Sequence, residues 1–168
     1  MNIISKMSAT DRTPLKAAPR TAILGFIGGF VCIGILSLLT GWTSASWLMA
    51  PFGASCVLAF GLWDAPLSQP RNIIGGHVVS TLTGLIVFYI FGQGPAALAL
   101  GVGLAISAMI LTKTTHPPAG ADPIVVILAG SGWSFLVTPV LVGSVLIVVC
   151  ALIINNLDEH RKYPTFWI

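Results

Sequence analysis

Six apolar segments of 14 to 20 residues fill this chain between positions 21 and 154, and the breaks between them are rich in Gly, Pro, Ser and Asn. The segments lie at 21–40, 45–62, 72–91, 95–111, 118–131 and 135–154. Soluble domains carry about a quarter charged residues, whereas this chain has 8% and a mean hydropathy of +0.94. The pattern predicts an all-α, polytopic bundle of transmembrane helices.

The second and fifth segments are short or interrupted, so the number of crossings has to be decided by charge. A full crossing needs about 20 apolar residues, which leaves four or six crossings. With six crossings and a cytoplasmic start, all eight basic residues lie inside; with four, Arg71 and Lys113 move outside. The positive-inside rule favours six crossings with both termini cytoplasmic, in an integral membrane protein that we assign to the bacterial inner membrane.

The segments divide the chain into a transmembrane domain at 21–155, a basic N-terminal tail at 1–20 and a short C-terminal tail at 156–168. The N-terminal tail has no apolar core, so we expect no cleaved signal peptide. The net charge of +3 comes from residues near segment ends. It relates to membrane orientation rather than to nucleic acid, which is not an expected partner.

The three cysteines, Cys32, Cys56 and Cys150, are odd in number, widely spaced and each embedded in apolar sequence. This spacing fits neither a disulfide framework nor a zinc site. We interpret them as small buried hydrophobic residues, and we expect no metal and no cofactor.

A motif of proline, any residue, glycine and alanine recurs in the two interrupted segments, as "PFGAS" at 51–55 and "PAGAD" at 118–122. The offset of 67 residues, from 51 to 118, maps the first three segments approximately onto the last three. Because three is odd, the halves would have opposite orientations. Inverted halves with Gly/Pro-interrupted segments are typical of transporters whose binding site lies near the midplane. The repeat therefore predicts a transport pathway.

Proline is well tolerated at the start of a helix, so Pro51 and Pro118 are each expected to begin a half-helix too short to cross the membrane. Opposed halves would bring the two helix starts together, and glycine there lets a ligand approach the backbone. Free N–H groups at helix starts favour an anion. The candidate contacts to the permeant in these starts are Pro51, Gly53, Ala54, Ser55, Pro117, Pro118 and Gly120.

One face of the third segment is polar, because His77, Ser80, Thr81 and Gly84 follow helical spacing. His77 and Thr81 are candidate contacts to the permeant, since an ionisable group inside a span is a functional hypothesis by default. The alternative is helix packing, because Gly76, Ser80 and Gly84 also form a ridge of small residues.

His116 and Asp122 flank the start of the fifth segment. Pro117 restrains His116 to an extended conformation, and the imidazole either contacts an anion, gates or carries a proton; a loop histidine bonded to backbone is the alternative. Asp122 either caps the helix or carries a proton that couples to transport. Arg71 and Lys113, at the ends of neighbouring spans, are candidate vestibule or gating residues.

Four motifs occur in order: "PFGAS" at 51–55, "SQPRN" at 68–72, "GGH" at 75–77 and "THPPAGADP" at 115–123. With them the chain resembles the HPP family of integral membrane proteins over roughly residues 20–155. Some plant and cyanobacterial members of that family are connected with nitrite transport. The resemblance implies a transporter or channel for a small inorganic anion. The chain departs from family descriptions in having six apolar segments rather than four, and we expect no soluble C-terminal regulatory domain of the kind that some relatives carry.

These observations predict a membrane transporter or channel for a small anion, with nitrite as the first candidate. The permeant anion is expected to bind near the two half-helix starts. One alternative is a channel for a neutral or cationic small species, with Asp122 as the selectivity residue. The other is a non-transporting membrane scaffold. Enzyme activity is not expected, because the chain has no Gly-x-Ser-x-Gly or HExxH motif. A homo-oligomer, dimer or trimer, is expected through small-residue faces such as Ala99, Gly103 and Ser107.

Overall fold

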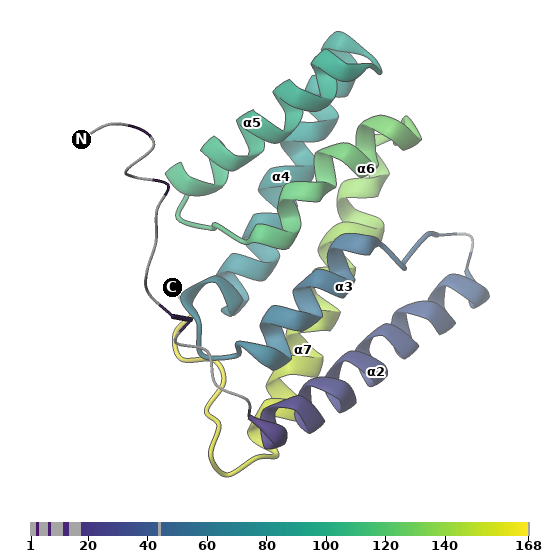
Figure 1. The fold of residues 1–168 in the computed structure, drawn as a ribbon. Coiled ribbons are helices and arrows are strands. Elements are labelled where there is room, and N and C mark those ends of the chain that lie inside the picture. Colours follow the sequence, from purple (N-terminus) through teal and green to yellow (C-terminus); the bar gives the residue numbers. More distant parts are fainter. Residues whose placement is uncertain (1–2, 4–6, 8–11, 14–17, 44, 168) are drawn as a thin grey trace.

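Helices are the only regular structure among the residues that the computed structural model describes, namely 3, 7, 12–13, 18–43 and 45–167 (Figure 1). Three of these helices are long and apolar enough to cross a membrane, by length and composition. They are α2 (Pro19–Trp42), α4 (Pro70–Phe91) and the stretch Trp133–Asn156, which is kinked at Thr138 and ends in α7 (Val142–Asn156). The chain is an all-α bundle of membrane helices, as the sequence predicts.

The second and fifth segments are short helices, as expected. α3 (Ala50–Cys56) continues as a π-helical turn, η1 (Val57–Gly61), and a 3-10 turn, η3 (Pro117–Ala121), leads into α6 (Asp122–Ala129). Each segment spans roughly 18–20 Å, against about 30 Å for a hydrocarbon core. The fourth segment, α5 (Pro95–Leu111), is also shorter than a full crossing.

Proline and glycine mark where these helices begin and end. Proline occupies the first turn of every helix from α2 to α6, where its missing N–H leaves no bond unmade. Pro51 begins α3 as expected, whereas Pro118 lies in the 3-10 turn and Pro123 occupies the first turn of α6. Gly92 and Gly130, with φ of +70° and +61°, end α4 and α6 in conformations that side chains disfavour.

The loops gather at two ends of the bundle. At one end Arg71 Nη2 donates to Thr112 O, and Tyr163 Oη donates to Ser68 O; we call this the charged end. At the other, Gln93 Nε2 donates to the carbonyl of Ile127 near the end of α6; its loops have no charged residue, and we call it the uncharged end. Successive helices alternate in direction, so corresponding segments of the two halves run oppositely.

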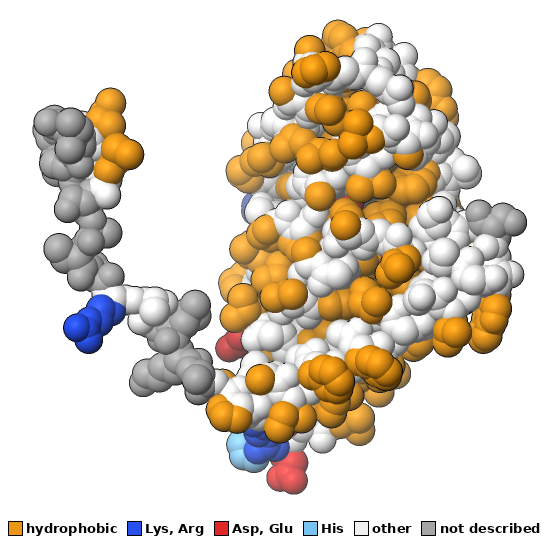
Figure 2. Space-filling model, turned by 45° about the vertical axis from the view of Figure 1, so that its right-hand side comes forward, with side chains coloured by type: hydrophobic (Ala, Val, Ile, Leu, Met, Phe, Trp, Pro, Cys, Tyr) orange, Lys and Arg blue, Asp and Glu red, His pale blue; other side chains and the backbone are white. Residues whose placement is uncertain are grey.

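The bundle has two packed regions. α4 packs against α5 and α6, while α2 packs against η1 and α7 (Figure 1). On the bundle face in Figure 2, hydrophobic side chains cover the whole length, and charged side chains lie toward its lower and left margins. Such a surface suits contact with lipid.

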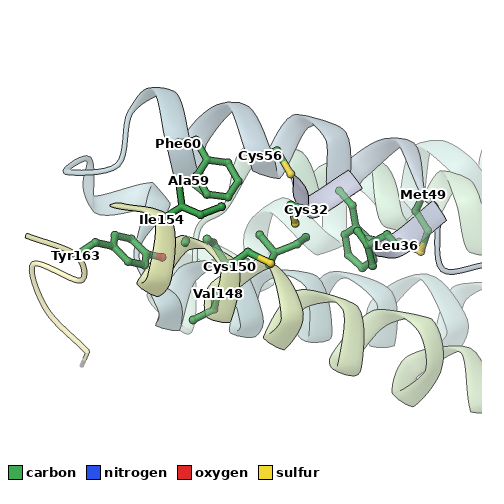
Figure 3. Close-up of a cluster of buried hydrophobic side chains, with 14 of the residues drawn as sticks. Cys32, Leu36, Met49, Cys56, Ala59, Phe60, Val148, Cys150, Ile154 and Tyr163 are labelled. Carbon is green, nitrogen blue, oxygen red and sulfur yellow. The ribbon is translucent and has the colours of Figure 1, made fainter. Parts of the chain in front are cut away.

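The three cysteines meet in one apolar core built by α2, α3–η1 and α7 (Figure 3). Each is a buried free thiol, which agrees with their interpretation as small hydrophobic residues. Two aromatic rings in this core fit only because glycine faces them. A Cβ at Gly28 would lie 2.3 Å from the ring of Phe60, and one at Gly143 would lie 2.4 Å from the ring of Phe52.

The chain after α7 folds back over the charged end, where Arg161 and Tyr163 are buried. The tail expected at 156–168 is thus anchored at Asp158, Arg161 and Tyr163, which are buried, while most of its other described residues are exposed. Most of the basic tail expected at 1–20 lies outside the described residues. The small-residue face of Ala99, Gly103 and Ser107 on α5 is exposed in the single chain, and its role in association stays a prediction.

Candidate functional site

Four polar side chains meet in the interior between the broken segments, and we call them the polar cluster: Ser55, His77, His116 and Asp122. All four are fully buried. Ser55 comes from α3, His77 from α4, His116 from the residue before η3, and Asp122 from the first position of α6. The structure therefore joins residues from both halves of the chain at one point.

Hydrogen bonds connect the polar cluster in one chain. Ser55 Oγ lies 2.8 Å from Nε2 of His77 and 2.8 Å from Nε2 of His116. On the far side of His77, Nδ1 lies 2.7 Å from Oδ2 of Asp122. On the far side of His116, Nδ1 lies 2.8 Å from the carbonyl oxygen of Leu67. The chain thus runs from Asp122 to a carbonyl in the loop at the charged end.

The partners of His116 fix the position of its hydrogen. A carbonyl only accepts, so His116 Nδ1 carries a hydrogen and donates it to Leu67 O, which leaves Nε2 of the neutral ring as an acceptor. Ser55 then donates its single hydrogen to that Nε2. If His116 takes up a second proton, Nε2 donates to Ser55 Oγ, and the hydroxyl hydrogen turns to the carbonyl of Pro51, 3.0 Å away. Both protonation states of His116 therefore keep a full set of partners.

His77 must hold a hydrogen on Nε2 in either state, because the Ser55 hydrogen is used elsewhere. Its Nε2 donates to Ser55 Oγ, and a further proton lies between Nδ1 and Asp122 Oδ2, as an imidazolium–carboxylate pair or as a neutral pair. Thr81 Oγ1 also donates to Asp122 Oδ2, at 3.3 Å. Asp122 Oδ1 is buried without a partner among the described residues. That oxygen is available to bind a proton or a donor.

Small residues on α4 allow the fifth segment to approach this closely. A Cβ at Gly76 would lie 2.6 Å from Cβ of His116, and one at Gly84 would lie 2.7 Å from Cα of Pro123. Between them, Ser80 Oγ donates to Ala119 O at 2.6 Å. The polar face of α4 thus has two parts. Its small residues allow close helix packing, as one interpretation expects, and His77 and Thr81 form hydrogen bonds with Asp122.

The other residues predicted in the half-helix starts are divided between the interior and the surface. Pro51 and Pro118 are buried, and Gly120 is half-buried. Ala54 and Pro117 are exposed. Gly53 faces a groove between α2 and α3–η1 rather than the polar cluster. Their contact with a permeant stays a prediction.

Arg71 and Lys113 lie at the charged end, away from the polar cluster. Arg71 is half-buried and ties the start of α4 to the end of α5 through Thr112 O, 3.2 Å away. Lys113 is exposed, with a positive φ of 58°. Among the described residues no group of His, Cys, Asp and Glu is arranged to hold a metal ion.

Three residues that contact or position the polar cluster were not predicted from the sequence. Phe52 is fully buried, and its ring lies 5.1 Å from that of His77, edge to face. Leu67 contributes only its carbonyl, which no sequence pattern reveals. Asn72, in "SQPRN", donates to Thr115 O at 2.9 Å and so holds the chain just before His116; a polar residue two positions after a helix-starting proline was the available signal.

The fold and the cluster define a helical membrane protein whose interrupted segments carry buried ionisable groups. Comparison with known proteins agrees. The model of the HPP transmembrane region matches residues 14–164, and the chain belongs to this family.

Two curated relatives from Dictyostelium discoideum, both named transmembrane proteins, are similar to this chain. One is 36% identical over 174 residues, covering 96% of this chain and 56% of the relative; the other is 35% identical over 128 residues, covering 71% and 45%. The chain thus spans about half the length of these relatives. No solved structure matches.

Proposed function

We propose that this protein moves a small monovalent anion, nitrite being the first candidate, across the membrane together with a proton. The observation that carries the proposal is the polar cluster itself. Ionisable side chains inside a membrane bundle are costly and mark substrate or proton pathways. Here they join the two interrupted segments, which is where transporters built from inverted halves bind their substrates.

The charge of the cluster supports proton coupling. The His77–Asp122 pair sums to zero in either arrangement, and His116 is neutral when Ser55 donates to it. The basic side chains nearest in sequence, Arg71 and Lys113, lie at the charged end. An anion in the cluster therefore needs a compensating charge that travels with it, and a proton on His116 supplies one. The Ser55 hydroxyl accommodates that proton by turning toward Pro51 O.

The test is uptake of nitrite and of chloride into liposomes that contain the purified protein, at one acidic and one neutral pH. We expect saturable nitrite uptake that is faster with an inward proton gradient. His116→Ala should abolish this uptake, because it removes the group that carries the proton, and Asp122→Asn should slow it, because His77 Nδ1 loses its carboxylate partner. His160→Ala is the matched control, since the His160 side chain is 70% exposed at the charged end. Uptake equal to that of empty vesicles would remove the anion proposal and favour the scaffold alternative. Cation-selective flux would favour a cation channel in which Asp122 is the selectivity residue.

A second candidate function is suggested by one observation. Ser55, His77 and Asp122 are connected in the order of a Ser-His-Asp hydrolase triad, through Nε2 and Nδ1 of the histidine. Against it, the Ser55 hydroxyl also contacts His116 and Pro51 and is fully buried. A fluorophosphonate probe distinguishes the two: a hydrolase would be labelled at Ser55, with labelling lost in His77→Ala, whereas a transporter would stay unlabelled.

A further inference from the structure

A hollow of about 630 Å³ opens at the uncharged end, between the loop after α2 and the chain that leads into α7. Five of its ten lining residues carry hydroxyl groups among apolar neighbours, and we call it the hydroxyl hollow: Thr43, Ser46, Ser131, Ser134 and Thr138. At Thr138 the backbone leaves the helical conformation, with φ −127° and ψ 114°. The hollow therefore lies where the long stretch Trp133–Asn156 is interrupted.

The hydroxyl hollow is lined by the chain that leads into α3 and the chain that leads into α7, and the polar cluster includes Ser55, further along α3. α3 and α7 both run away from the uncharged end. On the α7 side, Pro139 lines the hollow and Gly143 lies about one helical turn, roughly 6 Å, further along at 1.5 Å per residue. On the α3 side, Phe52 comes one turn before Ser55. The level of Gly143 and Phe52 therefore separates the hollow from the polar cluster.

The ring of Phe52 occupies this level. It is fully buried in the apolar core, a Cβ on Gly143 would lie 2.4 Å from its Cε2, and its ring centroid lies 5.1 Å from that of His77. Among the described residues, no hydrogen bond joins the loop 43–49 to the chain at 131–139. These two walls of the hollow could therefore separate without breaking a hydrogen bond between them.

We propose that the hydroxyl hollow is the entrance vestibule for the permeant, and that the ring of Phe52 is the gate between this vestibule and the polar cluster. The inference rests on the proposed function. Hydroxyl groups donate to a small anion without holding it as a fixed cation would, so the vestibule admits an anion and releases it. Turning the ring of Phe52 away from Gly143 would connect the vestibule to His77 and Ser55.

The first experiment measures access to the cluster and needs no knowledge of the permeant. Ser55→Cys is treated in detergent with a small, negatively charged methanethiosulfonate, and modification is followed by mass spectrometry. The native cysteines are buried, and the wild-type protein reports any reaction at them. We expect slow modification when Phe52 is present and modification at least about tenfold faster in the double variant with Phe52→Ala, because a barrier has been removed.

Phe60→Ala provides the matched control. Phe60 is equally buried on the same segment and packs on a glycine in the same way, but it faces α2 rather than His77. It should lower stability without exposing a cysteine at position 55. Equal modification in the Phe52 and Phe60 variants, or no acceleration by Phe52→Ala, would overturn the gate.

The second experiment tests the vestibule in liposomes. Ser134→Cys treated with the same reagent should lose most nitrite uptake, whereas Ala96→Cys, exposed near the same end but outside the hollow, should keep it. Unchanged uptake after complete modification of Ser134→Cys would overturn the vestibule. Absence of uptake in the wild-type protein would instead overturn the proposed function, and the access experiment would still decide on the gate.

Discussion

The two ends of this bundle are closed by different physical means. At the charged end, Arg161 Nη1 donates to Phe60 O at 2.9 Å and to Asn155 Oδ1 at 2.7 Å, and Tyr163 Oη donates to Ser68 O at 2.9 Å. At the uncharged end, the hydroxyl hollow stands open, and the ring of Phe52 separates it from the polar cluster. Opening the first end requires several buried polar groups to lose partners, whereas opening the second requires one apolar ring to move.

This difference indicates which end opens more easily. Leaving a buried polar group unpaired costs about 1–3 kcal/mol each, so the charged end should open rarely without a compensating ligand or proton. The uncharged end should open at a lower cost because the apolar ring of Phe52 has no hydrogen bond to lose when it moves. The following predictions test this asymmetry, from the largest expected effect to the smallest.

Arg161→Ala should be the most damaging substitution at the charged end. It leaves Phe60 O and Asn155 Oδ1 without their donor and removes the guanidinium from the ring of Trp63, 5.7 Å away. We expect a loss of about 2–4 kcal/mol in unfolding free energy, measured by thermal and denaturant unfolding in detergent. The neighbouring Lys162→Ala, at an exposed residue, should change little. Equal effects would show that the charged end is not held by this side chain.

Gly28→Ala and Gly143→Ala compare the two rings directly. Each adds a methyl group within 2.4 Å of a ring atom, and overpacking of this kind costs about 1–3 kcal/mol. If Phe52 moves as proposed, Gly143→Ala should cost less stability than Gly28→Ala, because the hollow begins one turn from Gly143, at Pro139. Gly29→Ala, with nothing within 4 Å of its Cβ, is the control. A larger cost at Gly143 than at Gly28 would contradict a mobile ring.

Tyr163→Phe removes one hydrogen bond from the charged end and leaves the ring in place. The carbonyl of Ser68 then loses its donor, and we expect a loss of about 1 kcal/mol. Tyr89→Phe, at the exposed tyrosine on α4, should be near neutral under the same unfolding assay. A neutral Tyr163→Phe would indicate that the loop 62–69 is held by packing instead.

Acid should weaken the charged end by a smaller amount. The backbone N–H of His160 and the Arg20 guanidinium hold the pKa of the Asp158 carboxyl below its usual range. A carboxyl with a lowered folded-state pKa stabilises the fold above its unfolded pKa of about 4. That stabilisation is lost as pH falls from there through the folded pKa. In a plot of melting temperature against pH, Asp158→Asn should therefore lose less stability at acid pH than the wild-type protein does. An unchanged pH dependence would exclude this carboxyl as the source of the acid effect.

The sequence by itself determined the helices and the kinds of residue that matter. Runs of apolar residues with proline at their starts are sufficient to produce helices in lipid, because every backbone group must find its partner within the segment. The sequence also predicted that the second and fifth helices are too short to cross the membrane, because their apolar runs are short or interrupted. The polar face of α4 followed from its 3.6-residue spacing, which is local information that no tertiary contact alters.

The tertiary structure alone decided which of those residues meet. Ser55 and His116 are 61 residues apart and His77 and Asp122 are 45 apart, and no local pattern fixes such pairings. Whether Gly53 or Ser55 faces the interior depends on the rotation of a helix that packs on several neighbours. Leu67 enters through a backbone carbonyl, a group that every residue has. Its role, like that of the ring of Phe52 against Gly143, exists only because packing brings distant segments to van der Waals and hydrogen-bond distance.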